Sequence, residues 1–89
     1  MANWRYTLKC GTELREAIHD EDCDRILDNI ETAWKEIHKR FPDEYEDYEL
    51  DSDLEDIECV REDASEGEIN HLLRNLYDYC DYYRIWVEL

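Results

Sequence analysis

Carboxylates are the side chains in this sequence whose number and spacing could do chemistry as a group. The segment from Asp43 to Asp63 holds twelve Asp or Glu residues and a single cation, Arg61. Carboxylates at this density can bind cations, serve in acid–base catalysis, or imitate the phosphates of a nucleic acid. Because like charges repel one another in a compact chain, such a segment is either unfolded or has a use for its charge.

The excess negative charge is local. Of the net charge of −16, the segment 43–63 carries −11, whereas residues 1–41 carry −2 and residues 64–89 carry −3. This balance argues against direct binding of DNA, RNA or an anionic membrane, because phosphate contacts need Lys and Arg. It favours cationic partners, which include metal ions, basic tails and the basic groove of a nucleic-acid-binding protein.

Catalysis would need a positioned set of side chains, and the sequence does not indicate one. His19, His38 and His71 stand in no recognisable nucleophile or metal motif, and the chain has only two glycines to build a phosphate-binding loop. We therefore expect a protein that is not an enzyme, with no catalytic residues and no cofactor.

Calcium binding is a second use for carboxylates. An EF-hand loop begun at Asp51 would place Asp53 third, Glu55 fifth and Glu62 twelfth, but it has Asp56 where the sharp turn requires glycine. We expect no specific metal site, and divalent-cation binding remains an alternative function.

Imitation of a nucleic acid is the third use, and a magnitude supports it. At about 1.5 Å per residue, a helix of the length of 43–63 spans roughly 30 Å and carries about one carboxylate per 2.6 Å. Duplex DNA carries about one charge per 1.7 Å and a single strand about one per 3.4 Å. The predicted partner contacts are the carboxylates Asp43, Glu44, Glu46, Asp47, Glu49, Asp51, Asp53, Glu55, Asp56 and Glu58, with Tyr45 and Tyr48 as aromatic anchors.

Hydrophobic periodicity predicts a strand at each end of the chain. Apolar and polar residues alternate over 3–9 and again over 82–89, which is the period of a β-strand. Neither strand has another strand to pair with. We therefore expect the two to pair with each other, bring the termini together and pack on helices.

Steps of three and four between apolar residues predict helices in the rest of the chain. Thr12 is the expected N-cap of a short helix. Asp20 or Asp22 begins a longer helix that ends at Phe41, because the residue before Pro42 avoids helical angles.

The acidic segment and the residues after it predict two further helices. The capping-box pattern "SDLE" indicates a one-sided helix over 53–63, with Tyr45 and Tyr48 in a preceding turn or short helix. A second such pattern, "SEGE", begins a helix over 66–81. The predicted fold is α+β, a single domain over 1–89 in which three or four helices pack on a small sheet that pairs the N-terminal and C-terminal strands.

The cysteines and the N-terminus indicate a cytoplasmic protein with reduced thiols. None of the four cysteines stands in a C-x-x-C pair, and "MANWRYTLK" lacks the apolar region of a signal peptide. We expect Cys23, Cys59 and Cys80 to be small core residues.

The small size, the acidic block with its tyrosines, and the ends "NWRYTLK" and "LYDYCDYYRIWVEL" resemble short phage and prophage accessory proteins of Gram-positive bacteria. Some proteins of that kind are anti-CRISPRs, which occupy the DNA-binding surface of a CRISPR nuclease. The likeness in the two ends covers about a quarter of the chain, and no individual functional residue is carried over from it. It implies a counter-defence protein that blocks recognition of target DNA.

Charge and resemblance together predict an inhibitor that presents an acidic surface to a basic nucleic-acid-binding protein, preferably a CRISPR nuclease. The acidic segment could instead be a solvated face that keeps a small protein in solution. A further alternative is a phage structural module or antitoxin-like protein that binds its partner through an apolar patch, formed by Tyr79, Tyr82 and Trp86. The sequence does not indicate an oligomeric state.

Overall fold

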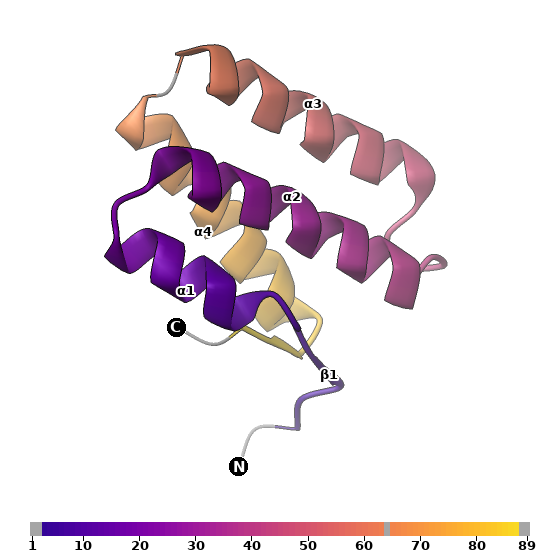
Figure 1. Ribbon diagram of the computed structural model, residues 1–89. Helices are drawn as coiled ribbons and strands as arrows, with labels where there is room; N and C mark the ends of the chain where they lie inside the picture. The colour runs from indigo at the N-terminus through magenta and orange to yellow at the C-terminus, as the bar shows by residue number, and fades with distance from the viewer. Residues whose placement is uncertain (1–2, 64, 88–89) are drawn as a thin grey trace.

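The structure is a computed structural model that describes residues 3–63 and 65–87. It is mostly helical, with a very small sheet (Figure 1). In chain order the elements are β1 (Tyr6–Thr7), α1 (Gly11–His19), α2 (Cys23–Arg40), α3 (Asp47–Asp63), α4 (Glu66–Tyr82) and β2 (Ile85–Trp86).

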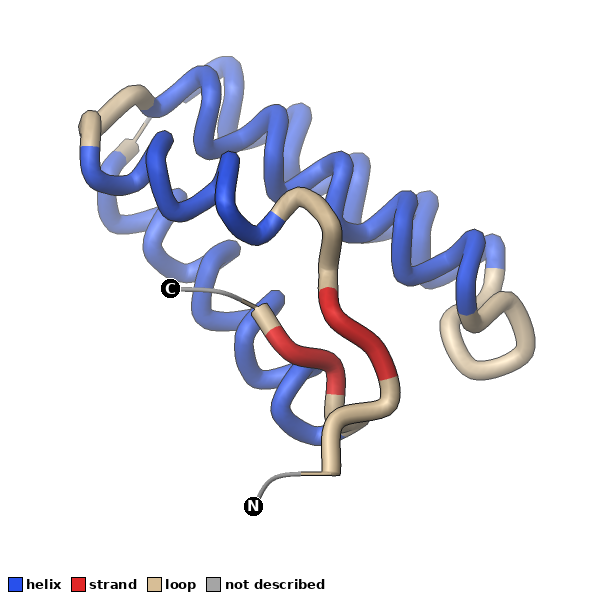
Figure 2. The backbone as a smooth tube through the Cα atoms, turned by 60° about the horizontal axis from the view of Figure 1, so that its bottom comes forward, coloured by secondary structure: helices blue, strands red, loops and turns tan. Residues whose placement is uncertain are grey.

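The helices form two layers. In Figure 1, α1, α2 and α3 lie side by side with α2 in the middle, and α4 crosses behind α2 and α1. The two short strands lie next to each other at one end of the molecule, between α4 and the start of α1 (Figure 2). The central position of α2 makes it the element on which the other three helices pack.

The predicted long helix is confirmed as α2, and its sequence explains why it forms. The Asp22 side chain is its N-cap and accepts a hydrogen bond from the backbone N–H of Arg25 (3.3 Å). Cations in the last turn suit the negative end of the helix dipole. Its apolar stripe is buried throughout and consists of Ile26, Leu27, Ile30, Ala33, Trp34 and Ile37.

The two terminal segments do pair, but over a shorter length than predicted. The strands are parallel, with Tyr6 opposite Ile85 and Thr7 opposite Trp86. The second strand begins late because α4 continues to Tyr82 and the chain then turns at Arg84, whose φ is 60°. The end of the predicted C-terminal strand, at 88–89, lies outside the described residues. The α+β prediction is thus right about the partners and wrong about how much sheet they make.

The predicted helix starts need two further corrections. The short helix begins at Gly11 with Cys10 as its N-cap, so Thr12 lies inside its first turn. Ser65 does stand at the N-cap of α4, but its side chain makes no capping hydrogen bond. The break between α1 and α2 is confirmed, and it includes Glu21 in the left-handed region at φ 55°.

The four cysteines are free thiols, and they divide into two kinds. Cys10 and Cys80 are buried, and burial raises the pKa of Cys10 to about 11 and that of Cys80 to about 12. Cys23 and Cys59 are exposed, so the prediction that they belong to the core is wrong. Cys23 is the first residue of α2, and Cys59 is two residues from the buried Ile57 on α3, so the helical rotation turns it away from the buried side.

Across residues 3–63 and 65–87, no helix combines the length and the apolar composition that crossing a bilayer would require.

Candidate acidic interface

The acidic segment is helical over most of its length. Helix α3 begins at Asp47, six residues earlier than predicted, so the "SDLE" pattern lies within the helix and does not cap it. The start is instead stabilised by Glu49, whose carboxylate accepts a hydrogen bond from the backbone N–H of Glu46 (3.2 Å). This is the reach-back half of a capping box, and the S/T-x-x-E pattern misses it because Glu46 stands where the pattern has Ser or Thr.

Helix α3 has one narrow buried side and one wide charged side. Ile57 and Val60 are its buried residues and face α2. Directly opposite them on the helix is a row of four exposed carboxylates, which we call the acidic row: Asp51, Glu55, Glu58 and Glu62. Because these positions follow steps of four, three and four, the carboxylates lie one above another along the axis.

The charge density of this helix is close to that of one nucleic-acid strand. Seven of its carboxylates are exposed: Asp47, Asp51, Glu55, Asp56, Glu58, Glu62 and Asp63. The 17 residues of α3 rise about 25 Å, which gives about one exposed carboxylate per 3.6 Å. The corresponding value for a single DNA strand is about one charge per 3.4 Å. The density is lower than the sequence alone suggested because Glu49 and Asp53 are half-buried.

Arg61, the one cation of the segment, is used to hold α3 in place. Its guanidinium contacts Asp28 (2.7 Å) and Glu31 (3.3 Å) on α2 and Glu58 (3.2 Å) on its own helix. Arg61 is half-buried between the helices. The cation therefore neutralises carboxylates at the α2–α3 contact and leaves most of the acidic row without an ion-pair partner among the described residues.

Tyr45 is not the surface anchor that the sequence predicted. Its side chain is only 2% exposed and stacks on Trp34, with ring centroids 5.0 Å apart and an interplanar angle of 22°. Its hydroxyl donates a hydrogen bond to Asp53, and burial raises the pKa of Tyr45 far above its ordinary value. An aromatic ring next to acids looks like a contact residue in sequence, but here it fixes the α2–α3 loop to the core. Tyr48, in contrast, is 67% exposed.

The loop carboxylates are partly used within the chain. Glu44 forms a two-pronged ion pair with Arg5, with N–O distances of 2.7 and 3.2 Å. This hydrogen bond lowers the pKa of Glu44. Asp47 contacts the His38 ring at 2.5 Å. Asp43 and Glu46 are exposed and flank the start of α3. The structure thus leaves the predicted acids with unequal freedom to meet a partner, because some are exposed and others are half-buried or paired within the chain.

The carboxylates do not converge on a point where a metal ion could sit. Asp51, Asp53, Glu55 and Glu62 belong to one continuous helix, so they are spread along its length and do not surround an ion as the ligands of an EF-hand loop do. Within the described part of the chain, no group of three or more metal-binding side chains gathers in one place.

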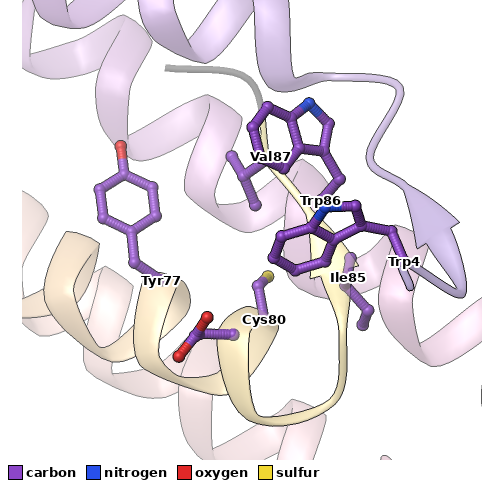
Figure 3. Close-up of a pocket in the computed structure, with 7 residues that line it drawn as sticks. Trp4, Tyr77, Cys80, Ile85, Trp86 and Val87 are labelled. Atoms are coloured by element: carbon purple, nitrogen blue, oxygen red, sulfur yellow. The ribbon is translucent and has the colours of Figure 1, made fainter. Parts of the chain in front are cut away.

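A second surface feature is a pair of exposed tryptophans that the sequence did not bring together. Trp4 and Trp86 are 38% and 42% exposed, and their rings meet edge to face with centroids 5.2 Å apart. They border a shallow, mostly apolar pocket that also includes Tyr77, Cys80, Asp81, Ile85 and Val87 (Figure 3). Of the apolar patch predicted from sequence, Trp86 and Tyr82 are exposed, but Tyr79 is half-buried and stacked on Tyr83 at 4.4 Å.

No family model matches this chain, and neither the curated proteins nor the solved structures contain a match to it. Its function has to be inferred from the chemistry of its own surface.

Proposed function

We propose that this protein is a non-enzymatic inhibitor whose acidic surface acts as a nucleic-acid mimic and blocks a DNA-binding protein. The preferred target is a CRISPR nuclease, as the resemblance to small phage accessory proteins implies. The carboxylates of α3 stand in for phosphates, and the exposed ring of Tyr48 packs against the partner. The other helices hold this surface rigid.

The observation that carries the proposal is the acidic row. Four exposed carboxylates, Asp51, Glu55, Glu58 and Glu62, follow one side of a regular helix opposite its buried residues. A basic groove meets such a row as it meets a phosphate backbone, by releasing counterions and by long-range attraction.

The arrangement has a cost that a merely solubilising surface would avoid. Like charges at positions i and i+4 destabilise a helix by about 0.2–0.5 kcal/mol per pair. Asp51 with Glu55 and Glu58 with Glu62 are two such pairs. A surface that served only solubility would intersperse Lys or Arg among these acids. No Lys or Arg stands within the acidic row, and this supports selection for a continuous negative surface.

A matched pair of charge-reversal variants tests the proposal. D51K/E55K removes the centre of the acidic row, whereas E16K/D78K reverses two exposed carboxylates on α1 and α4. Both variants change the net charge from −16 by the same amount. Asp53 is left unchanged because it accepts the Tyr45 hydrogen bond, and its loss would disturb the fold.

The assay measures binding to, and DNA cleavage by, a panel of guide-loaded CRISPR nucleases. We expect one of them to be inhibited by the wild-type chain, inhibition to be lost with D51K/E55K, and E16K/D78K to inhibit within about threefold of wild type. Inhibition that survives D51K/E55K would contradict the role of the acidic row. A panel with no inhibited nuclease would remove the preferred target.

The Trp4–Trp86 pair favours a second candidate function, in which the protein is a phage structural or antitoxin-like module that binds its partner through this apolar patch. Aromatic rings exposed side by side are typical of binding surfaces. Salt separates the two functions, because phosphate-like contacts weaken steeply with salt and apolar contacts do not. Binding that is insensitive to salt and lost in Trp86→Ala would favour this second function.

A further inference from the structure

A groove between the start of α3 and the end of α4 differs in character from the acidic row. It is lined by Tyr45, Tyr48, Glu49, Ser52, Asp53 and Tyr79. Tyr48 is exposed, Tyr79 is half-buried, and the two carboxylates are half-buried as well. The groove therefore combines aromatic walls with partly desolvated negative charge, whereas the acidic row offers negative charge in open solvent.

The two carboxylates of the groove have hydrogen bonds but no cation. Asp53 accepts from the Tyr45 hydroxyl, and Glu49 accepts from the backbone N–H of Glu46. Within the described residues, neither forms an ion pair. Burial and the neighbouring charges of Asp56 and Glu49 raise the pKa of Asp53.

Glu31, another half-buried carboxylate, differs because it has cationic partners within the chain. Glu31 is paired with Lys35 at 2.9 Å and with Arg61 at 3.3 Å, and these contacts lower its pKa. Asp53 is also half-buried, but the charged neighbours that act on its pKa, Asp56 and Glu49, are both acidic. A cation arriving from outside would therefore gain more in the groove than at an exposed carboxylate, because screening is weaker there.

We propose that this groove is a receptor for an arginine side chain of the protein partner. A guanidinium is flat, so it can lie against the rings of Tyr48 and Tyr79 while its N–H groups donate to Glu49 and Asp53. A lysine ammonium lacks both the flat face and the forked donors. The chain already contains one such arrangement, since Arg5 pairs with Glu44 while its guanidinium lies 4.5 Å from the centre of the Phe41 ring.

This inference rests on the proposed function, because it names the residue of the basic partner that the acidic surface would select. Nucleic-acid-binding grooves contain both Lys and Arg, and the acidic row would attract either by charge. The groove would add a preference for the positions at which the partner has arginine.

The test compares the affinities of tetra-arginine and tetra-lysine peptides for the isolated protein at physiological salt. The two peptides have equal charge, so non-specific attraction is the same for both. We expect tetra-arginine to bind about tenfold more tightly, with chemical shift changes at Tyr48 and Glu49. Equal affinities for the two peptides would overturn the inference.

Two variants and a control locate the preference. E49Q/D53N keeps the hydrogen-bond acceptors for Glu46 and Tyr45 and removes the two charges, and Y48A removes an exposed wall without touching the core. Either variant should reduce the ratio of tetra-arginine affinity to tetra-lysine affinity to near one. The control E55Q/E62Q, which removes two charges from the acidic row, should retain the arginine preference. A preference that survives both E49Q/D53N and Y48A would overturn the inference, and Y48A decides the matter if the double variant does not fold.

The peptide assay needs no partner, so its failure is distinguishable from failure of the proposed function. Equal affinities for the two peptides together with intact nuclease inhibition would overturn only the proposal that the groove binds arginine. A clear preference in a protein that inhibits no DNA-binding protein would overturn only the inhibitor function.

Discussion

Helices α2 and α3 have nearly the same length, 18 and 17 residues, and lie side by side, but α2 is mainly a core helix and α3 is mainly a surface helix. Helix α2 buries six side chains and α3 buries two. Helix α2 has a side-chain N-cap and three basic residues in its last turn, whereas the last turn of α3 has Arg61 followed by Glu62 and Asp63, whose charge opposes the helix dipole. Helix α3 is therefore a surface element whose helical form depends on its packing against α2.

The comparison predicts that truncation within α2 damages the whole fold. Trp34 is buried, stacks on Tyr45 and meets the edge of Tyr79 at 5.3 Å. We expect Trp34→Ala to lower the free energy of unfolding by about 3–5 kcal/mol, which a domain of this size would barely survive. Urea unfolding followed by circular dichroism measures the change. Trp86→Ala is the control, and a loss there as large as that of Trp34→Ala would contradict the comparison.

Truncation of the narrow buried side of α3 should cost less and act locally. Ile57 is fully buried against α2, and we expect Ile57→Ala to lower the free energy of unfolding by about 2–3 kcal/mol. Amide hydrogen exchange should quicken mainly in α3, while α2 keeps its protection. Cys59→Ala, on the exposed side of the same helix, should change stability by no more than about 0.5 kcal/mol. Equal acceleration of exchange in both helices would show that α3 is not the weaker partner.

Relief of repulsion in the acidic row should stabilise the fold slightly. Glu55→Lys converts the like-charge neighbours Asp51 and Glu58 into opposite-charge neighbours, and we expect a gain of about 0.5–1 kcal/mol. The control is Asp78→Lys on α4, which has Arg74 on one side and Asp81 on the other, so its effects cancel. Thermal melts at low and high salt measure both variants, and the gain should shrink as salt rises. A Glu55→Lys variant that is less stable than the wild type would mean that the charges of the acidic row are already neutralised in the folded protein.

The pH dependence of stability should contain opposite contributions from Asp53 of α3 and Glu31 of α2. Burial raises the pKa of Asp53, so its contribution to stability is lost as pH rises through that raised pKa and is regained on acidification. The hydrogen bond from Lys35 lowers the pKa of Glu31 below its ordinary value of 4.5, so its contribution is present above that pH and is lost below it.

Urea unfolding at constant ionic strength should therefore contain two opposite contributions: a rise in stability on acidification as Asp53 takes up its proton, and a decline below pH 4.5 as Glu31 takes up its own. D53N should weaken the rise and E31Q should weaken the decline, since each removes one titrating carboxylate. The same pH curve for D53N as for the wild type would show that Asp53 titrates alike in the folded and unfolded chains.

Much of the scaffold was predictable from sequence, because it depends on periodicity. The apolar steps of α2 and its cap at Asp22 gave nearly correct bounds, and alternation identified the two segments that pair. The start of α3 was missed because Tyr45 and Tyr48 occur in the same acidic context, although one ring packs on Trp34 and the other faces solvent. Which of two similar residues turns inward depends on tertiary packing, and periodicity does not contain that information.

The acidic surface was predictable in position but not in detail. Composition located the charge, and helical spacing would have found the acidic row if the helix had been predicted to begin at Asp47. The inward turn of Arg61 towards Asp28 and Glu31 and the pairing of Glu44 with Arg5 join residues far apart in sequence. The groove between α3 and α4 depends in the same way on contacts across the fold.

The most direct test of the central claim is competition between this protein and duplex DNA for a guide-loaded CRISPR nuclease, measured as a function of salt. We predict that DNA displaces the protein, that affinity falls steeply between low and physiological salt, and that D51K/E55K loses at least about 100-fold in affinity while E16K/D78K changes little. Simultaneous binding of DNA and protein to the nuclease, or equal losses in the two variants, would contradict the claim that α3 takes the place of a nucleic acid.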